Sequence, residues 1–234
     1  MRINPSELRL KKAADACQRL LASQKILVCA KNRLTLSALC LSAPIYQSLI
    51  GGTTTEDEAL QIQQENNPDL LITSEDLEKG YGIRLVEKAK EYSIDLKALI
   101  FLERETPEVV QEAMEAGADG VMFVSSVGTG SGDFVQALSS TNNGSVYYPE
   151  AVRKVATAKV KATPVLIDPL SEREQDIIRC IVQGMRNNEI ADALFISTET
   201  VKSHVSTAIQ KLGVRDRTQV AVFALTHGLV KTDI

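Results

Sequence analysis

The chain has 234 residues, enough for one large domain or two small ones. Its 44% of hydrophobic and 24% of charged residues are ordinary for a globular protein, and its net charge of −4 gives no overall sign of a nucleic-acid partner. No apolar run approaches the roughly 18–20 residues that cross a bilayer, and the start MRINPSELRLKKAADACQRL has no apolar signal-peptide core, so we expect a cytoplasmic protein without a membrane partner.

The first predicted element is a helix that Ser6 caps and that runs to about Ser23. An apolar stripe at helical spacing marks one face of it. The stripe consists of Leu10, Ala13, Ala14, Cys17, Leu20 and Leu21. We therefore treat residues 1–24 as an N-terminal helical extension.

Residues 25–145 alternate short apolar runs with helical patterns. The runs KILVCA, YQSLI, DLLIT, KALIFL and DGVMFV are strand-like, and amphipathic segments lie between them. Thr106-Pro107 marks one helix start, and Gly117 one helix end. Strands alternating with helices favour a five-stranded parallel sheet covered on both faces, a doubly wound α/β domain. We expect residues 146–167 to be a linker to an all-α C-terminal domain at 168–234, because the stretch from about Ala156 to Pro169 is aperiodic and contains two prolines.

The C-terminal segment carries signals for short helices. Ser171 and Glu174 form a capping box before an apolar helix that Gly184 ends. Asn188 is a predicted cap for a second helix, and Ser197 for a third after a tight turn. Two short helices joined by such a turn are the helix-turn-helix plan, in which the later helix enters the major groove of DNA.

The third predicted helix has two faces. One is apolar, with Val201, Val205 and Leu212, and the other is polar and locally basic although the segment is nearly neutral. Double-stranded DNA is therefore the predicted partner. The predicted DNA-binding residues are Thr200, Lys202, Ser203, His204, Ser206, Lys211, Arg215 and Arg217.

This segment resembles the LuxR-type helix-turn-helix domain of NarL/FixJ response regulators. The matching residues are Leu170, Glu172, Arg173, Glu174, Gly184, Asn188, Glu189, Ile190, Ala191, Leu194, Ile196, Ser197, Thr200, Val201, Lys202, His204, Val205, Lys211, Leu212 and Arg217. The resemblance implies that Lys202, Ser203 and Ser206 face the major groove. It also implies that the last helix, from Arg217 to Leu225, contributes to dimer contacts.

The α/β region resembles a response-regulator receiver more loosely, through PDLLIT, GYGIRLVEKAKE and PEVVQEAMEAGADG. A working receiver needs acidic residues for Mg²⁺, an aspartate nucleophile, a hydroxyl and a lysine. The aligned positions hold none of these groups in their places. They are Ala30 and Lys31 for the acidic pair, Ser74 for the nucleophile, Leu102 for the hydroxyl and Val124 for the lysine. We expect a pseudo-receiver that is not phosphorylated on aspartate, in which Lys31 can supply a positive charge where the metal would sit.

Three replacements for the phosphorylation signal stay open. The domain can be a constitutive dimerisation scaffold helped by the N-terminal helix. It can bind a ligand or partner at the edge of the sheet, where GTGSGD (128–133) can cradle an anion at a helix start. Cys29, at the end of the first strand, can sense redox state.

The leading hypothesis is a sequence-specific transcription regulator of the atypical response-regulator type that binds DNA as a homodimer. The alternative is an interaction protein whose helix-turn-helix contacts another regulator or RNA polymerase. We expect no enzyme, cofactor or metal site, because the only histidines are His204 and His227 and the four cysteines are widely spaced. The cysteines are Cys17, Cys29, Cys40 and Cys180.

Overall fold

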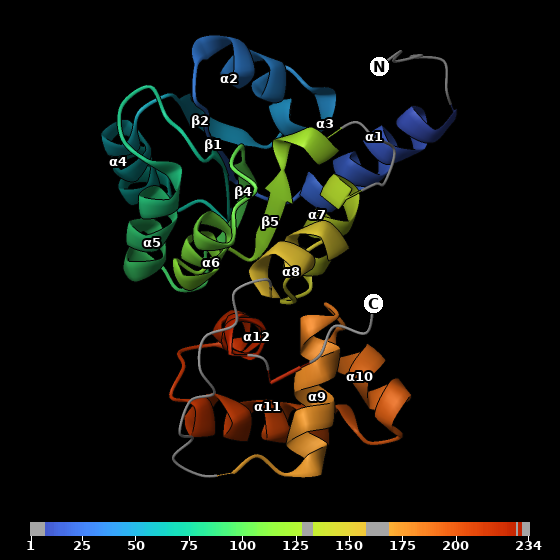
Figure 1. Cartoon of the computed structure of the whole chain (residues 1–234). Coiled ribbons are helices and arrows are strands. Elements are labelled where there is room, and N and C mark those ends of the chain that lie inside the picture. The colour runs from blue at the N-terminus through green and yellow to red at the C-terminus, as the bar shows by residue number, and fades with distance from the viewer. Residues whose placement is uncertain (1–7, 128–132, 158–168, 228, 231–234) are drawn as a thin grey trace. The chain divides into compact units, whose positions relative to one another are not determined.

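The computed structural model describes residues 8–127, 133–157, 169–227 and 229–230. In these residues the chain forms an α/β part and then a helical part (Figure 1). Most of the glycine-rich segment GTGSGD, at 128–132, lies outside the described residues, so the anion-cradle hypothesis stays a prediction.

A five-stranded parallel sheet forms the centre of the α/β part and confirms the predicted fold class. Its order is β2-β1-β3-β4-β5, which is the order of a doubly wound sheet. The strands are β1 (Ile26–Cys29), β2 (Leu49–Thr53), β3 (Leu70–Ser74), β4 (Lys97–Leu102) and β5 (Gly120–Phe123). Strand β2 begins three residues later than the run YQSLI predicts, because Tyr46 ends a short helix, α3 (Ala43–Tyr46).

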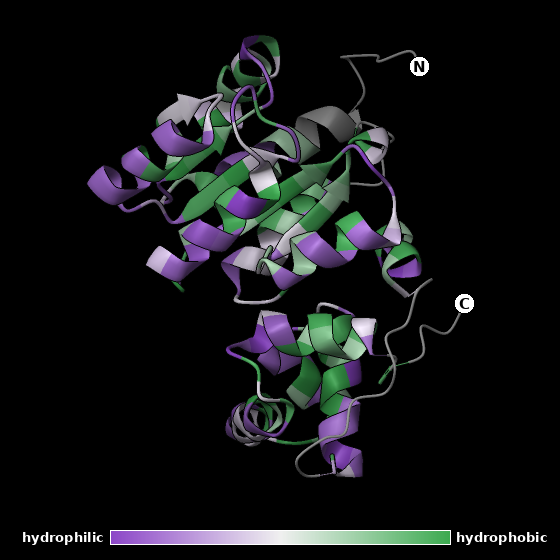
Figure 2. Ribbon diagram, turned by 60° about the vertical axis from the view of Figure 1, so that its left-hand side comes forward, coloured by the Kyte–Doolittle hydropathy of each residue, from purple (hydrophilic) through white to green (hydrophobic). Residues whose placement is uncertain are grey.

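Burial on both faces explains the continuous apolar runs of the central strands. Every residue of β1, β3 and β5 is buried, as is typical of a parallel sheet between two layers of helices. The strands are accordingly coloured as hydrophobic in Figure 2, whereas the helices around them carry hydrophilic residues on their outer sides.

Helices cover the sheet on both faces, as right-handed crossovers require (Figure 1). The helices of one layer are α4 (Glu56–Asn66), α5 (Gly82–Tyr92) and α6 (Pro107–Glu115). The other layer contains α2 (Arg33–Cys40), α3 and α7 (Asp133–Asn142). As predicted, Thr106 precedes the first turn of α6, and Gly117 has a positive φ of 94° just beyond its end.

The N-terminal helix α1 (Leu8–Leu21) packs on the α/β part of its own chain, beside α3 (Figure 1). Cys17 and Leu21 of its apolar stripe are buried there. The Ser48 hydroxyl donates a 2.5 Å hydrogen bond to the carbonyl oxygen of Leu21, which fixes the end of the helix. This part of the stripe is therefore occupied within one chain.

The interval predicted to be a linker is partly structured. Helix α8 (Glu150–Thr157) lies within it and buries Val152 and Ala156. The side-chain amide of Gln111 donates to the carbonyl oxygen of Ala156 at 3.1 Å and thereby joins α8 to α6. Residues 158–168, the remainder of that interval, lie outside the described residues.

The helical part contains α9 (Glu172–Val182), α10 (Asn187–Leu194), α11 (Thr198–Leu212) and α12 (Arg217–Thr226). One apolar core joins these helices. Its fully buried members include Ile177, Ile181, Ile190, Val201, Ala208, Val220 and Leu225. The predicted all-α architecture of this part is confirmed.

Candidate functional site

The first helix of the helical part begins with the predicted capping box. The backbone N–H of Ser171 donates to the Glu174 carboxylate at 2.7 Å, and the N–H of Glu174 donates to the Ser171 hydroxyl at 3.3 Å. These two bonds satisfy donors that the first turn of a helix otherwise leaves without partners. Gly184, with a positive φ of 80°, follows the end of the helix as predicted.

The second helix starts differently from the prediction. Asn188 lies inside α10 instead of capping it, and the helix begins at Asn187 after the N-cap Arg186. The N–H of Arg186 donates to the Glu189 carboxylate at 2.6 Å. A side-chain acceptor at the third helical position therefore serves the N-terminus where the sequence suggested a capping Asn.

A tight turn of Phe195 and Ile196 leads into α11, which begins at the predicted cap. The Ser197 hydroxyl accepts a 3.1 Å hydrogen bond from the N–H of Thr200. It also lies 2.8 Å from the Thr200 hydroxyl, so one of the predicted DNA-binding side chains is held at the helix start.

Helix α11 presents one buried and one exposed face, as its sequence predicts. Its buried residues are Val201, Val205, Ala208 and Leu212. The exposed residues of the helix are Glu199, Thr200, Lys202, Ser203, Ser206 and Gln210, while His204 is half-buried. Five of the predicted contact residues, Thr200, Lys202, Ser203, His204 and Ser206, thus lie along the part of one helix that the core leaves open.

Lys202 has only a surface partner. Its ammonium lies 2.8 Å from the Glu199 carboxylate, and both side chains are exposed. Such exposed pairs contribute little free energy, so the ammonium can leave Glu199 for a phosphate or a base edge at small cost.

Lys211, another predicted contact, is held inside the helical part. Its ammonium lies 2.9 Å from the Glu174 carboxylate and 3.1 Å from the Pro169 carbonyl oxygen. Burial alone would raise the pKa of Glu174, but the hydrogen bonds from Lys211 and Ser171 outweigh it and lower that pKa. Lys211 therefore fastens the end of α11 to the start of α9.

Arg217 is also engaged within the helical part. Its guanidinium donates to the Asn187 side-chain oxygen at 2.7 Å and to the carbonyl oxygen of Met185. Burial lowers the pKa of Arg217 to about 10. The structure thus brings Arg217 to the α9–α10 turn, whereas the eighth predicted contact, Arg215, is exposed.

The residues predicted to form a degenerate phosphorylation pocket lie at the carboxyl edge of the sheet. Ala30 and Leu102 are fully buried, Ser74 is buried at the end of β3, and Val124 is exposed. The ammonium of Lys31 lies 2.5 Å from the Glu103 carboxylate, a hydrogen bond that raises the pKa of Lys31. This pair joins the loops that follow β1 and β4.

A buried carboxylate holds the backbone of Glu103, one member of that pair. Glu75, fully buried directly after Ser74, accepts a 2.7 Å hydrogen bond from the N–H of Glu103. Neither Glu75 nor Glu103 is among the pocket residues predicted from the sequence. The signal that could have found Glu103 is its position one residue after β4, at the same sheet edge as Lys31.

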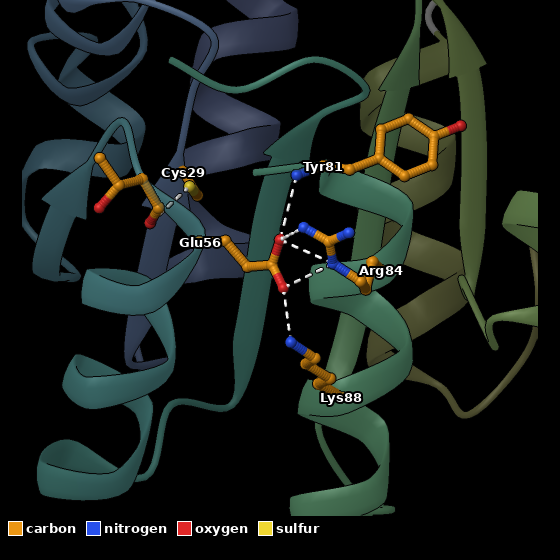
Figure 3. A network of polar contacts seen from close by, with 6 residues as sticks. Cys29, Glu56, Tyr81, Arg84 and Lys88 are labelled. Carbon is orange, nitrogen blue, oxygen red and sulfur yellow. Dashed lines mark hydrogen bonds and ion pairs between the residues drawn. The ribbon is translucent and has the colours of Figure 1, made fainter. Parts of the chain in front are cut away.

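An ion-pair cluster centred on Glu56 joins α4 to α5 nearby (Figure 3). The buried Glu56 carboxylate lies 2.6 Å from Arg84 and 2.9 Å from Lys88, and it accepts a 3.1 Å bond from the N–H of Tyr81. The Arg84 hydrogen bonds do most to lower the pKa of Glu56 to about 2. This cluster was not anticipated from the sequence, because the partners lie 25 to 32 residues from Glu56 along the chain.

Cys29 is buried at the end of β1, and its thiol lies 3.6 Å from the carbonyl oxygen of Thr55 (Figure 3). Burial, followed by the charges of Glu56 and Glu58, raises the pKa of Cys29 to about 12. A thiol in this state is a poor redox sensor at neutral pH, because the thiolate is the reactive form.

Within the described ranges, no three His, Cys, Asp or Glu side chains gather in a way that could hold a metal ion. No helix in these ranges has both the length and the apolarity needed to span a membrane.

A receiver-like α/β part followed by a helix-turn-helix part defines a class of two-domain regulators. A family model described as "Bacterial regulatory proteins, luxR family" matches residues 168–224. The Response regulator protein VraR of Staphylococcus aureus (strain Mu3 / ATCC 700698) is 32% identical over 184 residues, which cover 78% of this chain and 86% of the relative. VraR of Staphylococcus saprophyticus is 30% identical over the same shares. The chain therefore belongs to the response regulators of the NarL/FixJ type, which carry a LuxR-type helix-turn-helix.

The fold is also found in solved structures. One described as two RcsB dimers bound to two parallel DNAs has a TM-score of 0.51 at 20% identity, and the match covers 87% of this chain and 99% of that chain. A second, of an RcsB–DNA complex, has a TM-score of 0.50 over the same shares. At this identity the likeness establishes the shared fold.

Proposed function

We propose that this response regulator binds double-stranded DNA sequence-specifically as a homodimer and controls transcription without aspartyl phosphorylation. The observation that carries the proposal is the open polar face of α11. Lys202, Ser203 and Ser206 are exposed there, while the opposite face of the same helix is buried in the core. A helix so placed can enter a major groove without disturbing its own packing.

The exposed residues suit two different tasks in DNA recognition. The Lys202 ammonium can bind a phosphate or a guanine edge, and the hydroxyls of Ser203 and Ser206 can bond to base edges. Lys211 and Arg217 would act indirectly. The Lys211–Glu174 bond holds α11 to α9, and the Arg217–Asn187 bond holds the start of α12 to the start of α10. The related RcsB fold, solved in complex with DNA, supports this assignment by likeness.

The phosphorylation pocket supports the second half of the proposal. In the alignment made from the sequence, Ser74 takes the place of the nucleophile, and a serine hydroxyl is not the carboxylate that forms an acyl phosphate. In the same alignment Lys31 takes the place of an acid that would bind Mg²⁺, and its ammonium is paired with Glu103. The partly exposed Lys31–Glu103 ion pair lies at the edge where a phosphorylated receiver would hold metal and phosphoryl group.

A homodimer follows from how a helix-turn-helix reads DNA. A single α11 reaches only a few base pairs, and two copies related by a twofold axis read half-sites about 34 Å apart. Cys17 and Leu21 of α1 are buried within their own chain. We therefore propose that this part of α1 does not form the dimer contact.

Selection of binding sites from random duplex DNA tests the proposal, with the full chain and no phosphodonor. We expect a short inverted repeat to be enriched, because two copies of α11 would read it. Failure to enrich any sequence, with the protein folded and dimeric, would contradict sequence-specific DNA binding and favour the role as an interaction protein for another regulator or RNA polymerase.

Substitution of Lys202 by Ala then tests the face itself. We expect about a tenfold or larger loss of affinity for the selected duplex, and a slope of log affinity against log salt that is smaller by about 1 if Lys202 contacts a phosphate. Lys154→Ala is the matched control, because Lys154 is likewise an exposed helical lysine paired at 2.8 Å with a glutamate, here Glu150. Equal affinity of the two variants would rule out this face as the DNA interface.

A further inference from the structure

Phe195, in the turn between α10 and α11, combines two costly features. Its side chain is 94% exposed, the highest value among the large hydrophobic residues that the structure describes as exposed. Its backbone is left-handed, with φ of 55° and ψ of 46°, at the C-cap of α10. Gly or Asn is the usual residue in this conformation, because a Cβ is unfavourable there.

The packing of the helical part does not account for a phenylalanine at this place. The turn is already anchored by Ile190 and Ala191, which are buried, and by the N–H of Ile196, which donates to the carbonyl oxygen of Ala191 at 3.0 Å. The aromatic ring adds no buried contact to this core. An Asn would therefore satisfy the fold at least as well as Phe195.

Phe195 lies just before the N-terminus of the proposed recognition helix. Phe195 precedes the N-cap Ser197 by two residues, and in a helix-turn-helix the N-terminal residues of the second helix contact base edges. In that docking, a side chain just before the N-terminus would lie near the rim of the groove, where deoxyribose carbons and thymine methyl groups form the apolar surface of the duplex.

We propose that Phe195 is a DNA-contacting residue whose ring packs on this apolar surface at the groove rim, which adds affinity that polar contacts of α11 do not supply. This inference rests on the proposed DNA-binding function. The ring has water on nearly all sides in the free protein, so burial against the duplex would be favourable by the hydrophobic effect. The left-handed backbone holds the ring at a fixed place before α11.

The Phe195→Asn variant tests the proposal because fold and binding should respond in opposite directions. Asn suits the left-handed conformation, so we expect an equal or higher melting temperature. We expect affinity for the selected duplex to fall roughly five- to tenfold, and Phe195→Tyr to retain it, because the ring is kept. Leu41→Asn is the matched control, since Leu41 is another exposed apolar residue at a helix C-cap, that of α2.

A second arm separates the two sources of apolar surface. Thymines of the selected duplex are replaced one at a time by uracil, which removes only the C5 methyl group. If one replacement weakens the wild type but leaves the Phe195→Asn variant unchanged, the ring contacts that methyl group. If none does while the variant binds weakly, the ring contacts the deoxyribose carbons.

Three results would overturn the inference. Unchanged affinity of Phe195→Asn for DNA is the first, and it leaves the proposed function intact if the wild type binds. A fall in melting temperature that accompanies the loss of binding is the second, because it would make the role structural. The third is unchanged DNA binding with lost activation of RNA polymerase, which would assign the ring to a protein partner. A wild type that binds no duplex would instead refute the proposed function itself.

Discussion

At the scale of single residues, Glu56 shows how a buried charge is retained. A carboxylate taken out of water loses hydration, and this loss is compensated only when partners are close and hydrogen-bonded. Arg84, Lys88 and the N–H of Tyr81 meet both oxygens of Glu56, and two of these partners come from the same helix, α5. The cluster therefore couples the start of α4 to α5, both on one face of the sheet.

Replacement of Glu56 by Gln should destabilise the protein. Gln keeps the shape but removes the charge, so Arg84 and Lys88 lose their buried counter-ion. We expect the free energy of unfolding to fall by about 1.5–3 kcal/mol, the range for hydrogen bonds to charged groups, as measured by urea titration at pH 7. Glu65→Gln, at an exposed position of the same helix, is the control and should change little. An effect of Glu56→Gln no larger than that of the control would contradict the proposed coupling.

Glu56 also predicts how stability depends on pH. The pKa of its carboxylate is lowered from 4.5 to about 2 in the folded chain, so the ionised form favours folding. This contribution is fully present above pH 4.5, the unfolded value, and is lost as pH falls through that range toward about 2. Urea titrations across this window should show the wild type losing its advantage over Glu56→Gln. A constant difference between the two would mean that another group governs the acid response.

At the scale of elements, the junction of β3 and α5 depends on one glycine. The N–H of Gly82, the first residue of α5, donates to the carbonyl oxygen of Glu75 at 2.7 Å. A Cβ at Gly82 would lie 1.8 Å from the carbonyl oxygen of Ser74, which is backbone and cannot move aside cheaply. The close approach brings α5 directly against the end of the strand that carries Ser74 and Glu75.

Gly82→Ala should therefore be far more damaging than an ordinary glycine substitution. We expect a loss of roughly 4 kcal/mol or more in the free energy of unfolding, in the range that marks a steric clash in a packed region. Gly144→Ala is the control, because Gly144 has a φ of +70° but nothing within 4 Å of an added Cβ. That variant should lose only about 1–2 kcal/mol, the cost of the left-handed backbone alone. Similar losses in both variants, measured by urea titration, would contradict the role assigned to the close approach.

The elements also show what the sequence could and could not predict. The central strands and the caps Ser171 and Ser197 were predictable, because continuous apolar runs and local side-chain acceptors act within a few residues. The start of α10 was not, because the Glu189 carboxylate accepts from the N–H of Arg186 and the helix begins at Asn187, one residue before the predicted cap. Lys211 and Arg217 looked like free cations, since their partners Glu174 and Asn187 lie 37 and 30 residues away. Tertiary pairing of this kind leaves no local periodicity.

At the scale of the whole molecule, the chain combines a helix-turn-helix domain of the luxR family with a receiver-like α/β fold. A phosphorylated receiver changes state when metal and phosphoryl group bring new charge to the carboxyl edge of the sheet. In this chain the Lys31–Glu103 pair and the buried Glu75 already connect the loops at that edge. We therefore expect this edge of the sheet not to respond to a phosphodonor.

The full-length protein should therefore be indifferent to a small phosphodonor such as phosphoramidate with Mg²⁺. We expect no gain of a phosphoryl group in the intact mass and no change in affinity for the selected duplex, because Ser74 replaces the acyl-forming carboxylate and Lys31 repels the metal. A phosphorylatable response regulator treated in parallel shows that the donor is active. A phosphoryl group found on Glu75 or Asp76, accompanied by tighter DNA binding, would show that the pocket signals by a shifted acceptor and would refute phosphorylation-independent control. Modification without a change in DNA affinity would refute only the inertness of the pocket, because regulation would still proceed without it.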